Sequence, residues 1–468
     1  MKKGVKISAV DSKRVFRGTG YYDTEALNDL KQLVKECAKK YGNAVGFKFK
    51  DKEGRVTGRT FAEFDRHIDC LGTALISLGL KDAHISIISE NRYEWGVCYY
   101  SIVNGTGVAV PMDKYLPQAE VENLIERGKV EAIFYSPTYQ DMMTEIAKSN
   151  SRIKYYICME DNENIDKNDP RFITLNSLII MGQQLLEAGD RSFVDASIDK
   201  DKMSIILFTS GTTSISKGVM LSHSNIVSNV KSIASTIYLD HNDVYLSLLP
   251  LHHTFENTIG LALMVYKGVC IAYCDGIRHV VQNLREYKVS VLIVVPAILE
   301  VMYKRLKEGI EKSGKKKLVD TLVKVSDTLL AVGIDLRRKL FKSIFEQFGP
   351  DLRLVVSGAA PLDREVIVGF NKLGLKVLEG YGLTEASPVV AANNDYINKP
   401  GTVGPPLADV EVAIDKPDEN GMGEIIVRGG NVMLGYYEDP ASTAEVLDKD
   451  GWLRTGDLGI IDEEGCIK

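Results

Sequence analysis

The feature of this sequence that most constrains its fold is a repeated pairing of a helix-like stretch with a short apolar run. Residues 60–80, "TFAEFDRHIDCLGTALISLGL", place apolar residues at helical spacing, and residues 84–90, "HISIISE", then read as a short buried strand. The same pairing recurs at residues 94–112 and 119–136. Alternation of this kind predicts parallel sheets covered by helices, the α/β class.

The pattern changes after residue 393, where short strand-like runs alternate with Gly, Pro and Asp turns. Such a texture predicts a small antiparallel barrel or meander. A chain of 468 residues is also too long for one ordinary core. We therefore predict two helix-covered, mostly parallel α/β subdomains at residues 1–200 and 201–392, and a small β-barrel-like subdomain at residues 393–468.

Composition narrows the class of protein. Hydrophobic residues make up 45% of the chain and charged residues 26%, as in soluble globular proteins. The net charge is -6, which argues against a general nucleic-acid binder, so an anionic ligand must be met by local cations. The cationic start lacks the apolar segment of a signal peptide, and no later run is long and uncharged enough to span a bilayer. We expect a cytoplasmic protein.

The seven cysteines are scattered along the sequence, which is typical of reduced thiols. Cys270 and Cys274 share one face of a strand-like run, and a metal pair is the alternative interpretation, although no matching His or Cys cluster accompanies them.

A basic segment at residues 304–348 carries apolar residues at helical intervals. We expect two solvated surface helices here. The alternative is a weak contact with a membrane surface, because basic amphipathic helices favour anionic lipid. The protein would then be peripheral to the inner face of the membrane.

The loop "TSGTTSISKG" follows the apolar run at residues 204–208 and combines hydroxyl groups, glycine and one lysine. Phosphate oxygens need donors that approach closely and a compensating cation, so this loop predicts an anion cradle. The loop departs from a Walker-type P-loop, because Ser216 precedes the lysine and Gly218 follows it, which argues against an NTPase of that type. A flexible Ser/Thr turn is the alternative. The residues we expect to hold phosphate are Thr209, Ser210, Gly211, Thr212, Thr213, Ser214 and Lys217.

This loop resembles the phosphate loop of adenylate-forming enzymes, the superfamily of acyl-CoA synthetases, luciferases and peptide-synthetase adenylation domains. The family form is Thr-Ser-Gly-Thr-Thr-Gly-x-Pro-Lys-Gly, and Ser214 and Ser216 stand here in place of the glycine and the proline. Four further family-like segments follow in order: "LPLHHTFE", "SGAAPL", "EGYGLTE" and "WLRTGD". With the basic helical insertion, the sequence looks most like the large N-terminal domain of bacterial long-chain fatty acid–CoA ligases.

The resemblance implies roles for particular residues. His253 and Phe255 would flank a substrate carboxylate, Tyr381 would stack on adenine, and Asp457 would hold the ribose hydroxyls. Glu385 would bind Mg²⁺, which prefers one or two protein oxygens. The implied catalytic residues are Lys217, His253, Thr384 and Glu385. The other implied nucleotide contacts are Gly358, Ala359, Ala360, Glu379, Gly380, Gly382 and Thr384. The alternatives are a core tyrosine at 381, capping roles for Thr384 and Glu385, and a turn aspartate at 457.

The activity implied is ATP-dependent conversion of a medium- or long-chain fatty acid to acyl-AMP and pyrophosphate, followed by transfer to coenzyme A. A carboxylate is already a nucleophile, so the main task is electrostatic neutralisation of two anions that must meet. The apolar pattern of residues 254–268 suits an alkyl pocket or, alternatively, a core helix. A ligase that loads an acyl carrier protein or stops at acyl-AMP, and a nucleotide-binding relative without turnover, are the alternatives.

The family continues past this point with a hinge and a mobile, lysine-bearing C-terminal domain, whereas this sequence ends at Lys468. We therefore expect these residues to bind nucleotide and to adenylate poorly.

Overall fold

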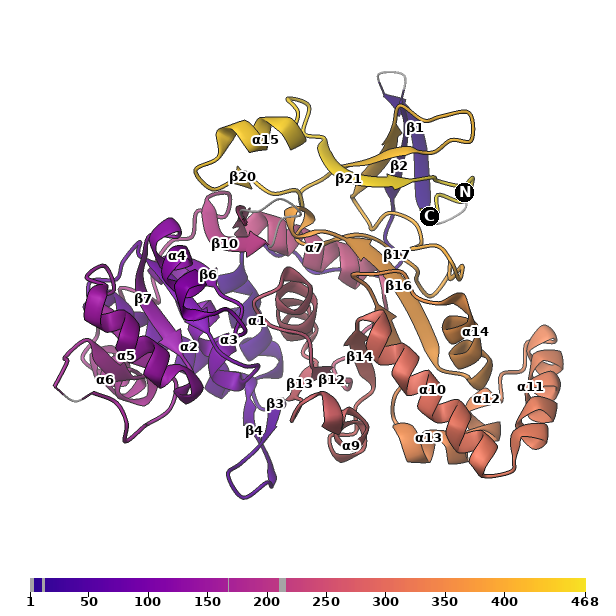
Figure 1. Cartoon of the computed structure of the whole chain (residues 1–468), viewed down its shortest axis with the longest axis horizontal. Coiled ribbons are helices and arrows are strands. Elements are labelled where there is room, and N and C mark those ends of the chain that lie inside the picture. The colour runs from indigo at the N-terminus through magenta and orange to yellow at the C-terminus, as the bar shows by residue number, and fades with distance from the viewer. Residues whose placement is uncertain (1–3, 11–12, 167, 210–215) are drawn as a thin grey trace.

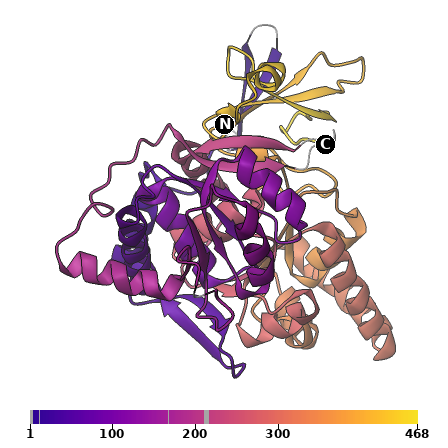
Figure 2. The same cartoon turned by 60° about the vertical axis from the view of Figure 1, so that its left-hand side comes forward.

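Three β-sheets organise the protein. The computed structural model describes residues 4–10, 13–166, 168–209 and 216–468, and the small sheet stands above the two large ones in both views (Figures 1 and 2). Helices cover the large sheets, so the α/β class is confirmed. The small third sheet is antiparallel and open in its described strand order.

The first large sheet is parallel in its centre and antiparallel at one edge. Its strand order is β20-β11-β10-β6-β5-β7-β8-β9, and β10, β11 and β20 form the antiparallel edge. Its strands are β5 (His84–Ile88), β6 (Val108–Pro111), β7 (Val130–Tyr135), β8 (Tyr155–Cys158), β9 (Phe172–Thr174), β10 (Met203–Thr209), β11 (Lys217–Ser222) and β20 (Gly435–Tyr436).

The second large sheet has the order β17-β16-β15-β14-β12-β13-β3-β4 and is antiparallel at both ends. Its strands are β3 (Val45–Lys50), β4 (Val56–Thr60), β12 (Val244–Ser247), β13 (Cys270–Tyr273), β14 (Val291–Val294), β15 (Leu354–Ser357), β16 (Lys376–Gly382) and β17 (Val389–Ala392). The small sheet contains β1 (Val5–Val10), β2 (Lys13–Gly18), β18 (Glu411–Asp415), β19 (Gly423–Arg428) and β21 (Leu453–Gly459).

Helices lie in each of the three regions, residues 60–80, 94–112 and 119–136, where the sequence pairs a helix-like stretch with an apolar run. The second helix begins at Phe61 because Thr60 and Glu63 form a capping box, with the Glu63 backbone N–H donating to Thr60 Oγ1 at 3.1 Å. The α-helices are α1 (Leu30–Tyr41), α2 (Phe61–Ser77), α3 (Tyr93–Ser101), α4 (Gln118–Arg127), α5 (Gln140–Ser149), α6 (Leu175–Glu187), α7 (His223–Thr236), α8 (Met264–Lys267), α9 (Val280–Glu286), α10 (Pro296–Lys312), α11 (Lys316–Ala331), α12 (Arg337–Leu340), α13 (Lys342–Phe348), α14 (Arg364–Leu373) and α15 (Pro440–Val446). Shorter or π-type turns are η1 (Ile102–Thr106), η2 (Pro137–Tyr139), η3 (Phe255–Leu263), η4 (Ile277–His279) and η5 (Thr384–Ala386).

Strands from distant parts of the sequence complete each sheet. The hairpin β1–β2 pairs with β18, β3 and β4 extend the second sheet, and β10 and β11 extend the first. The boundaries at residues 200 and 392 stay a prediction, and the sheets draw strands from across them. The N-terminal hairpin was not predicted, because its alternating polar residues carry a weak apolar signal.

The basic segment differs from the prediction of two solvated helices. The first helix, α10, begins at Pro296, where proline suits the first helical turn, and the segment also contains α11, α12 and α13. Phe341, Phe345 and Phe348 are buried in the same apolar cluster as Leu299 and Met302. The end of the segment therefore belongs to the core.

None of the helices in the described ranges is long and apolar enough to cross a membrane.

Candidate functional site

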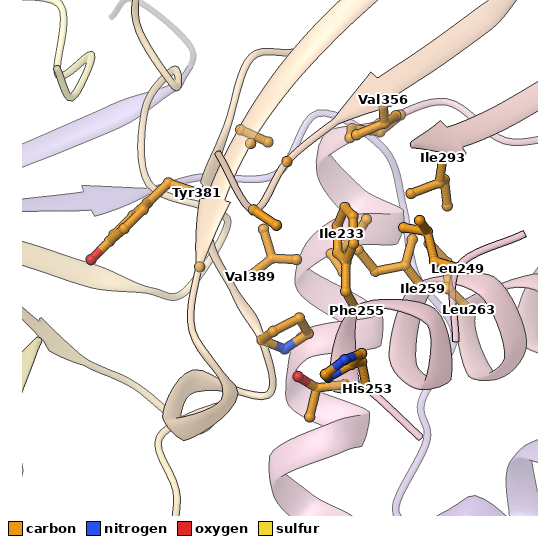
Figure 3. Close-up of a pocket in the computed structure, with 18 of the residues that line it drawn as sticks. Ile233, Leu249, His253, Phe255, Ile259, Leu263, Ile293, Val356, Tyr381 and Val389 are labelled. Atoms are coloured by element: carbon orange, nitrogen blue, oxygen red, sulfur yellow. The ribbon is translucent and has the colours of Figure 1, made fainter. Parts of the chain in front are cut away.

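A cavity of about 460 Å³ opens between the second large sheet and the helical elements α7, η3 and α8 (Figure 3). Most of its wall is aliphatic. Two of its walls come from β14 and β15, which run in parallel with Val291 opposite Leu354. Alternate residues of both strands reach it, because side chains on a strand point to one face every second residue. These are Val291, Ile293 and Val295 from the β14 segment and Leu354, Val356 and Gly358 from the β15 segment.

The apolar part of the cavity runs back along these strands from its mouth. Val291 and Val295 are four positions apart, which corresponds to about 13 Å of extended chain. Ile233 of α7 and Ile259 and Leu263 of η3 cover the strands from the opposite side (Figure 3). The segment predicted to form an alkyl pocket therefore does line the cavity.

Glycine and small residues form the mouth. A Cβ atom added to Gly358 would lie 3.0 Å from the ring of Phe255, so glycine permits this close approach. Ala359 follows with a left-handed φ of 69°, a conformation that turns the chain sharply after β15. Gly380, Tyr381 and Thr384 continue the same rim.

Tyr381 links β16 to β21. Its hydroxyl donates to Asp457 Oδ2 at 2.6 Å, although 76 residues separate the two positions. Burial, and then the hydrogen bond to Asp457, raise the pKa of the tyrosine. The ring lines the cavity, and its hydroxyl points away from the aliphatic side chains (Figure 3). Tyr381 and Asp457, which are predicted to contact adenine and ribose, are thus neighbours.

A cation, an aromatic ring and a carboxylate stand in a row beside the mouth. Lys217 Nζ lies 4.9 Å from the centre of the Tyr436 ring. The Tyr436 hydroxyl donates to Glu385 Oε1 at 2.9 Å, and burial followed by the charge of Glu385 raises its pKa. Thr384 and Glu385 form the short η5 turn, in which neither side chain caps a helix. Tyr436 was missed from the sequence, since nothing local marks it as a partner of Lys217.

Two adjacent histidines occupy different positions. The ring centres of His252 and His253 are 4.1 Å apart, and burial lowers the pKa of both, that of His252 to about 3. His252 faces Asp113 at 3.8 Å, while His253 and Phe255 line the cavity. Both imidazoles are therefore neutral near pH 7, so they can hydrogen-bond to a ligand but do not supply a positive charge.

Several predicted contacts do not line the cavity itself, and Glu379 and Ala360 also lie apart from the row beside its mouth. The Glu379 carboxylate accepts a hydrogen bond from the Gly401 backbone N–H at 3.3 Å, and Ala360 is exposed beyond the rim. Thr209 sits opposite Lys217 in the β10–β11 pairing. The remaining predicted loop residues, Ser210, Gly211, Thr212, Thr213 and Ser214, lie outside the described residues.

Glu385 is the carboxylate that stands at the predicted metal position. The described ranges hold no group of three or more His, Cys, Asp or Glu side chains placed to bind a metal, and this includes Cys270 and Cys274. A single carboxylate such as Glu385 nevertheless fits Mg²⁺, which completes its shell with phosphate oxygens and water.

A model of the AMP-binding enzyme family matches residues 34–437. The chain belongs to this family. The match spans the cavity, both large sheets and the row from Lys217 to Glu385. The resemblance inferred from the motifs is therefore confirmed.

One relative of this AMP-binding family member is long-chain-fatty-acid–CoA ligase 1 of Homo sapiens. The two sequences are 31% identical over 439 residues, and the match covers 86% of this chain and 60% of the relative. The chain thus spans about 60% of the length of that relative.

Solved structures share the fold. A long-chain-fatty-acid–CoA ligase from Archaeoglobus fulgidus superposes with a TM-score of 0.76 at 20% identity, covering 96% of this chain and 85% of that one. The N-terminal domain of FACL13 from Mycobacterium tuberculosis gives 0.71 at 20% identity, with 94% and 99% covered. These likenesses confirm the adenylate-forming N-terminal fold.

Proposed function

We propose that this protein activates a medium- or long-chain fatty acid with ATP, giving acyl-AMP and pyrophosphate, and then transfers the acyl group to coenzyme A, releasing AMP. The observation that carries the proposal is one continuous cavity with an aliphatic interior and a mouth lined by Gly358, Tyr381 and Thr384. An alkyl chain fits the interior, and a nucleotide fits the mouth. The name of the human relative supports the same substrate class.

The residues at the mouth divide the work of binding the nucleotide. Tyr381 offers a ring face for adenine, worth about 1 kcal/mol beyond its buried area. Asp457, exposed beside it, accepts hydrogen bonds from the ribose hydroxyls. Lys217 neutralises phosphate charge, and Thr384 donates to the α-phosphate. Mg²⁺ held by Glu385 would add positive charge at the phosphates.

The reacting carboxylate enters between His253 and Phe255. Because His253 is neutral, it can donate one N–H to the carboxylate without removing its negative charge. The carboxylate oxygen attacks the α-phosphorus, the bond to the pyrophosphate oxygen breaks, and pyrophosphate leaves. The thiol of coenzyme A then attacks the acyl carbon, and AMP departs with the electron pair of the broken bond.

The acceptor and the location form part of the proposal. We take coenzyme A as the acceptor, with an acyl carrier protein as the alternative, and the cytoplasm as the compartment. All seven cysteines are free, and six of them are buried, as expected for a protein of a reducing compartment.

Calorimetry with Mg·ATP tests the nucleotide site. We expect Mg·ATP to bind with a measurable heat. Lys217→Ala should weaken the affinity at least tenfold, because one charge-assisted contact contributes about 1.5–3 kcal/mol. Lys52→Ala changes an exposed lysine in the turn between β3 and β4, far along the chain from this row, and this matched control should bind as the parent does. A heat that is absent, or that Lys217→Ala leaves unchanged, contradicts the proposal.

Pyrophosphate exchange across a panel of carboxylic acids tests the chemistry. The assay uses the gene product of natural length, since these residues span about 60% of the human relative. We expect exchange to be fastest with fatty acids. Nucleotide binding without exchange for any acid would favour the non-catalytic alternative, and exchange confined to amino acids would exclude the fatty acid.

A further inference from the structure

Arg127, the last residue of α4, contacts the chain on both sides of the predicted phosphate loop. Its Nη1 donates to Ser216 Oγ at 3.0 Å, and its Nη2 donates to the Ser216 carbonyl oxygen. On the other side of the loop, the guanidinium carbon lies 5.1 Å from the centre of the Phe208 ring. One side chain thus connects the end of β10 with the residue that precedes β11.

The contacted residues adjoin those predicted to hold phosphate. Thr209 lies opposite Lys217 in the β10–β11 pairing, and Ser216 directly precedes Lys217. Ser216 stands where the family form has proline, whose ring fixes the backbone φ angle. Serine lacks that restraint, and the two hydrogen bonds from Arg127 supply another one at the same residue.

No carboxylate competes for the Arg127 guanidinium group. The side chain is half-buried, and among the described residues it joins no ion pair. The neighbouring Glu126 pairs with Arg152 at 3.2 Å. Every polar contact that the structure gives to the Arg127 side chain therefore goes to Ser216, and hydrogen bonds from a charged donor are the stronger kind.

The α4 corner, residues 127–129, is itself fixed against the first large sheet (Figure 1). A Cβ atom added to Gly128 would lie 3.2 Å from Val110 of β6, so glycine permits this close approach. The Gly128 carbonyl accepts a hydrogen bond from Nδ1 of His84, the first residue of β5, at 2.7 Å. Lys129 then turns the chain into β7 with a left-handed φ of 51°. Arg127 therefore reaches Ser216 from a rigid base.

The α4 corner also holds the aromatic partner of Lys217. Lys129 forms an ion pair with Glu438, and its Nζ lies 5.9 Å from the centre of the Tyr437 ring. The preceding residue, Tyr436, has its ring centre 4.9 Å from Lys217 Nζ. The backbone before Lys217 and the ring that Lys217 faces are thus both anchored to the end of α4.

We propose that Arg127 is a positioning residue which, through Ser216, holds Lys217 in the orientation that meets the nucleotide phosphates. This inference rests on the proposed function, in which Lys217 neutralises phosphate charge. Arg127 does not touch the nucleotide itself, because its donors are engaged by Ser216. A lysine held in place before the ligand arrives loses less conformational freedom on binding. Removal of Arg127 should therefore weaken Mg·ATP binding only through Lys217.

A double-mutant cycle, measured by calorimetry with Mg·ATP, tests the proposal. Arg127→Ala should weaken the affinity about threefold to thirtyfold, as expected for coupled neighbours. Arg127→Lys keeps the charge but not the bidentate contact, so its affinity should lie between those of Arg127→Ala and the parent. In a Lys217→Ala background, either change should alter the affinity less than about twofold, because no lysine is left to position. Losses that add would show that Arg127 acts independently of Lys217 and would overturn the proposal.

Pyrophosphate exchange with the gene product of natural length separates positioning from a general loss of structure. Arg127→Ala should raise the KM for Mg·ATP and leave the KM for the fatty acid unchanged. Arg285→Ala removes an exposed arginine from the last turn of α9, and this matched control should behave as the parent does in both assays. Equal rises in the two KM values of Arg127→Ala would indicate general disruption and would overturn the positioning role.

The outcomes distinguish this inference from the proposed function. If the parent protein binds no Mg·ATP, the proposed function fails, and the role of Arg127 fails with it. If the parent binds Mg·ATP and both Arg127 variants bind it equally well, the proposed function stands and only the role of Arg127 is overturned.

Discussion

One buried carboxyl group stands out among the individual residues. Glu256, next to Phe255 at the start of η3, is fully buried. It accepts hydrogen bonds from the Tyr245 and Ser247 hydroxyls, each at 2.6 Å. Asn91 donates to Ser247 Oγ at 2.9 Å and so connects this group to the segment that follows β5 of the first large sheet. Burial raises the pKa of Glu256 to about 8 despite these bonds.

Glu256→Gln should change the pH dependence of stability. The native carboxyl holds its proton up to about pH 8, whereas in the unfolded chain it loses the proton near pH 4.5. The native state therefore binds more protons in that window, and this group's contribution falls as pH rises, by at most about 1.4 kcal/mol per pH unit. The free energy of unfolding from urea titrations at pH 5 to 8 measures it.

Glutamine keeps the shape of the side chain and cannot titrate, so the variant should lose this slope. Asp418→Asn, at an exposed turn, provides the control and should retain it. Parallel curves for the parent and Glu256→Gln across the window would contradict the buried-acid interpretation.

The sequence identified some site residues and missed others for a physical reason. Tyr381 and Asp457 stand in segments with recognisable local patterns, and the fold brings them together. Tyr436 carries no local signal, because its role comes from a contact made across the fold with Glu385. Glu256 ends the segment "LPLHHTFE", but nothing in that segment shows that its carboxyl group is buried against Tyr245 and Ser247. Glu379 shows the opposite error. It lies in the recognised segment "EGYGLTE", but its carboxylate accepts a hydrogen bond from a backbone amide and does not face the cavity.

At the scale of elements, β14 and β15 set the shape of the cavity. Both strands are apolar on both faces, so periodicity alone could not say which side chains face the ligand. The structure separates them: Val291 and Ile293 belong to the cluster around the cavity, and Leu292 packs on the opposite face.

Val291→Phe should shorten the cavity at the end farthest from the mouth. We expect the preference in pyrophosphate exchange to move to shorter fatty acids, with a stability cost of about 1–3 kcal/mol from overpacking. Leu292→Phe is the matched control on the same strand, because it should be destabilising without changing chain-length preference. If the chain-length profile shifted equally in both variants, or in neither, the cavity face of β14 would not determine chain-length preference.

For the whole molecule, the small sheet depends on residues from both ends of the described chain. The Gly18 N–H donates to the Val410 carbonyl at 3.1 Å, and the Asp409 N–H donates to the Gly18 carbonyl at 3.1 Å. Val15 packs in one cluster with Ala413, Ile426 and Trp452. Antiparallel strands in the tail were predictable from their turns, whereas their partner hairpin was not, since pairing over almost 400 residues leaves no local pattern.

Val15→Ala should destabilise the small sheet by about 2 kcal/mol, from lost burial and the space left behind. Urea unfolding followed by tryptophan fluorescence in a Trp95→Phe background reports on this cluster through the buried Trp452, because Trp95 belongs to another core cluster. Ile7→Ala, on the neighbouring strand but 48% exposed, should stay within about 0.5 kcal/mol of the parent. If the two variants unfolded at the same urea concentration, the hairpin would not be part of the cooperative unit.

The dispersed strands also bear on synthesis in the cell. As the nascent chain leaves the ribosome, β2 is made early, and its partner β18 arrives only after residue 411. The first sheet likewise receives its last strand, β20, after residue 435. Until then, unpaired strand edges stay open to pairing with other chains. We expect the newly synthesised protein to depend on chaperones for longer than a protein in which each strand pairs with strands made just before it.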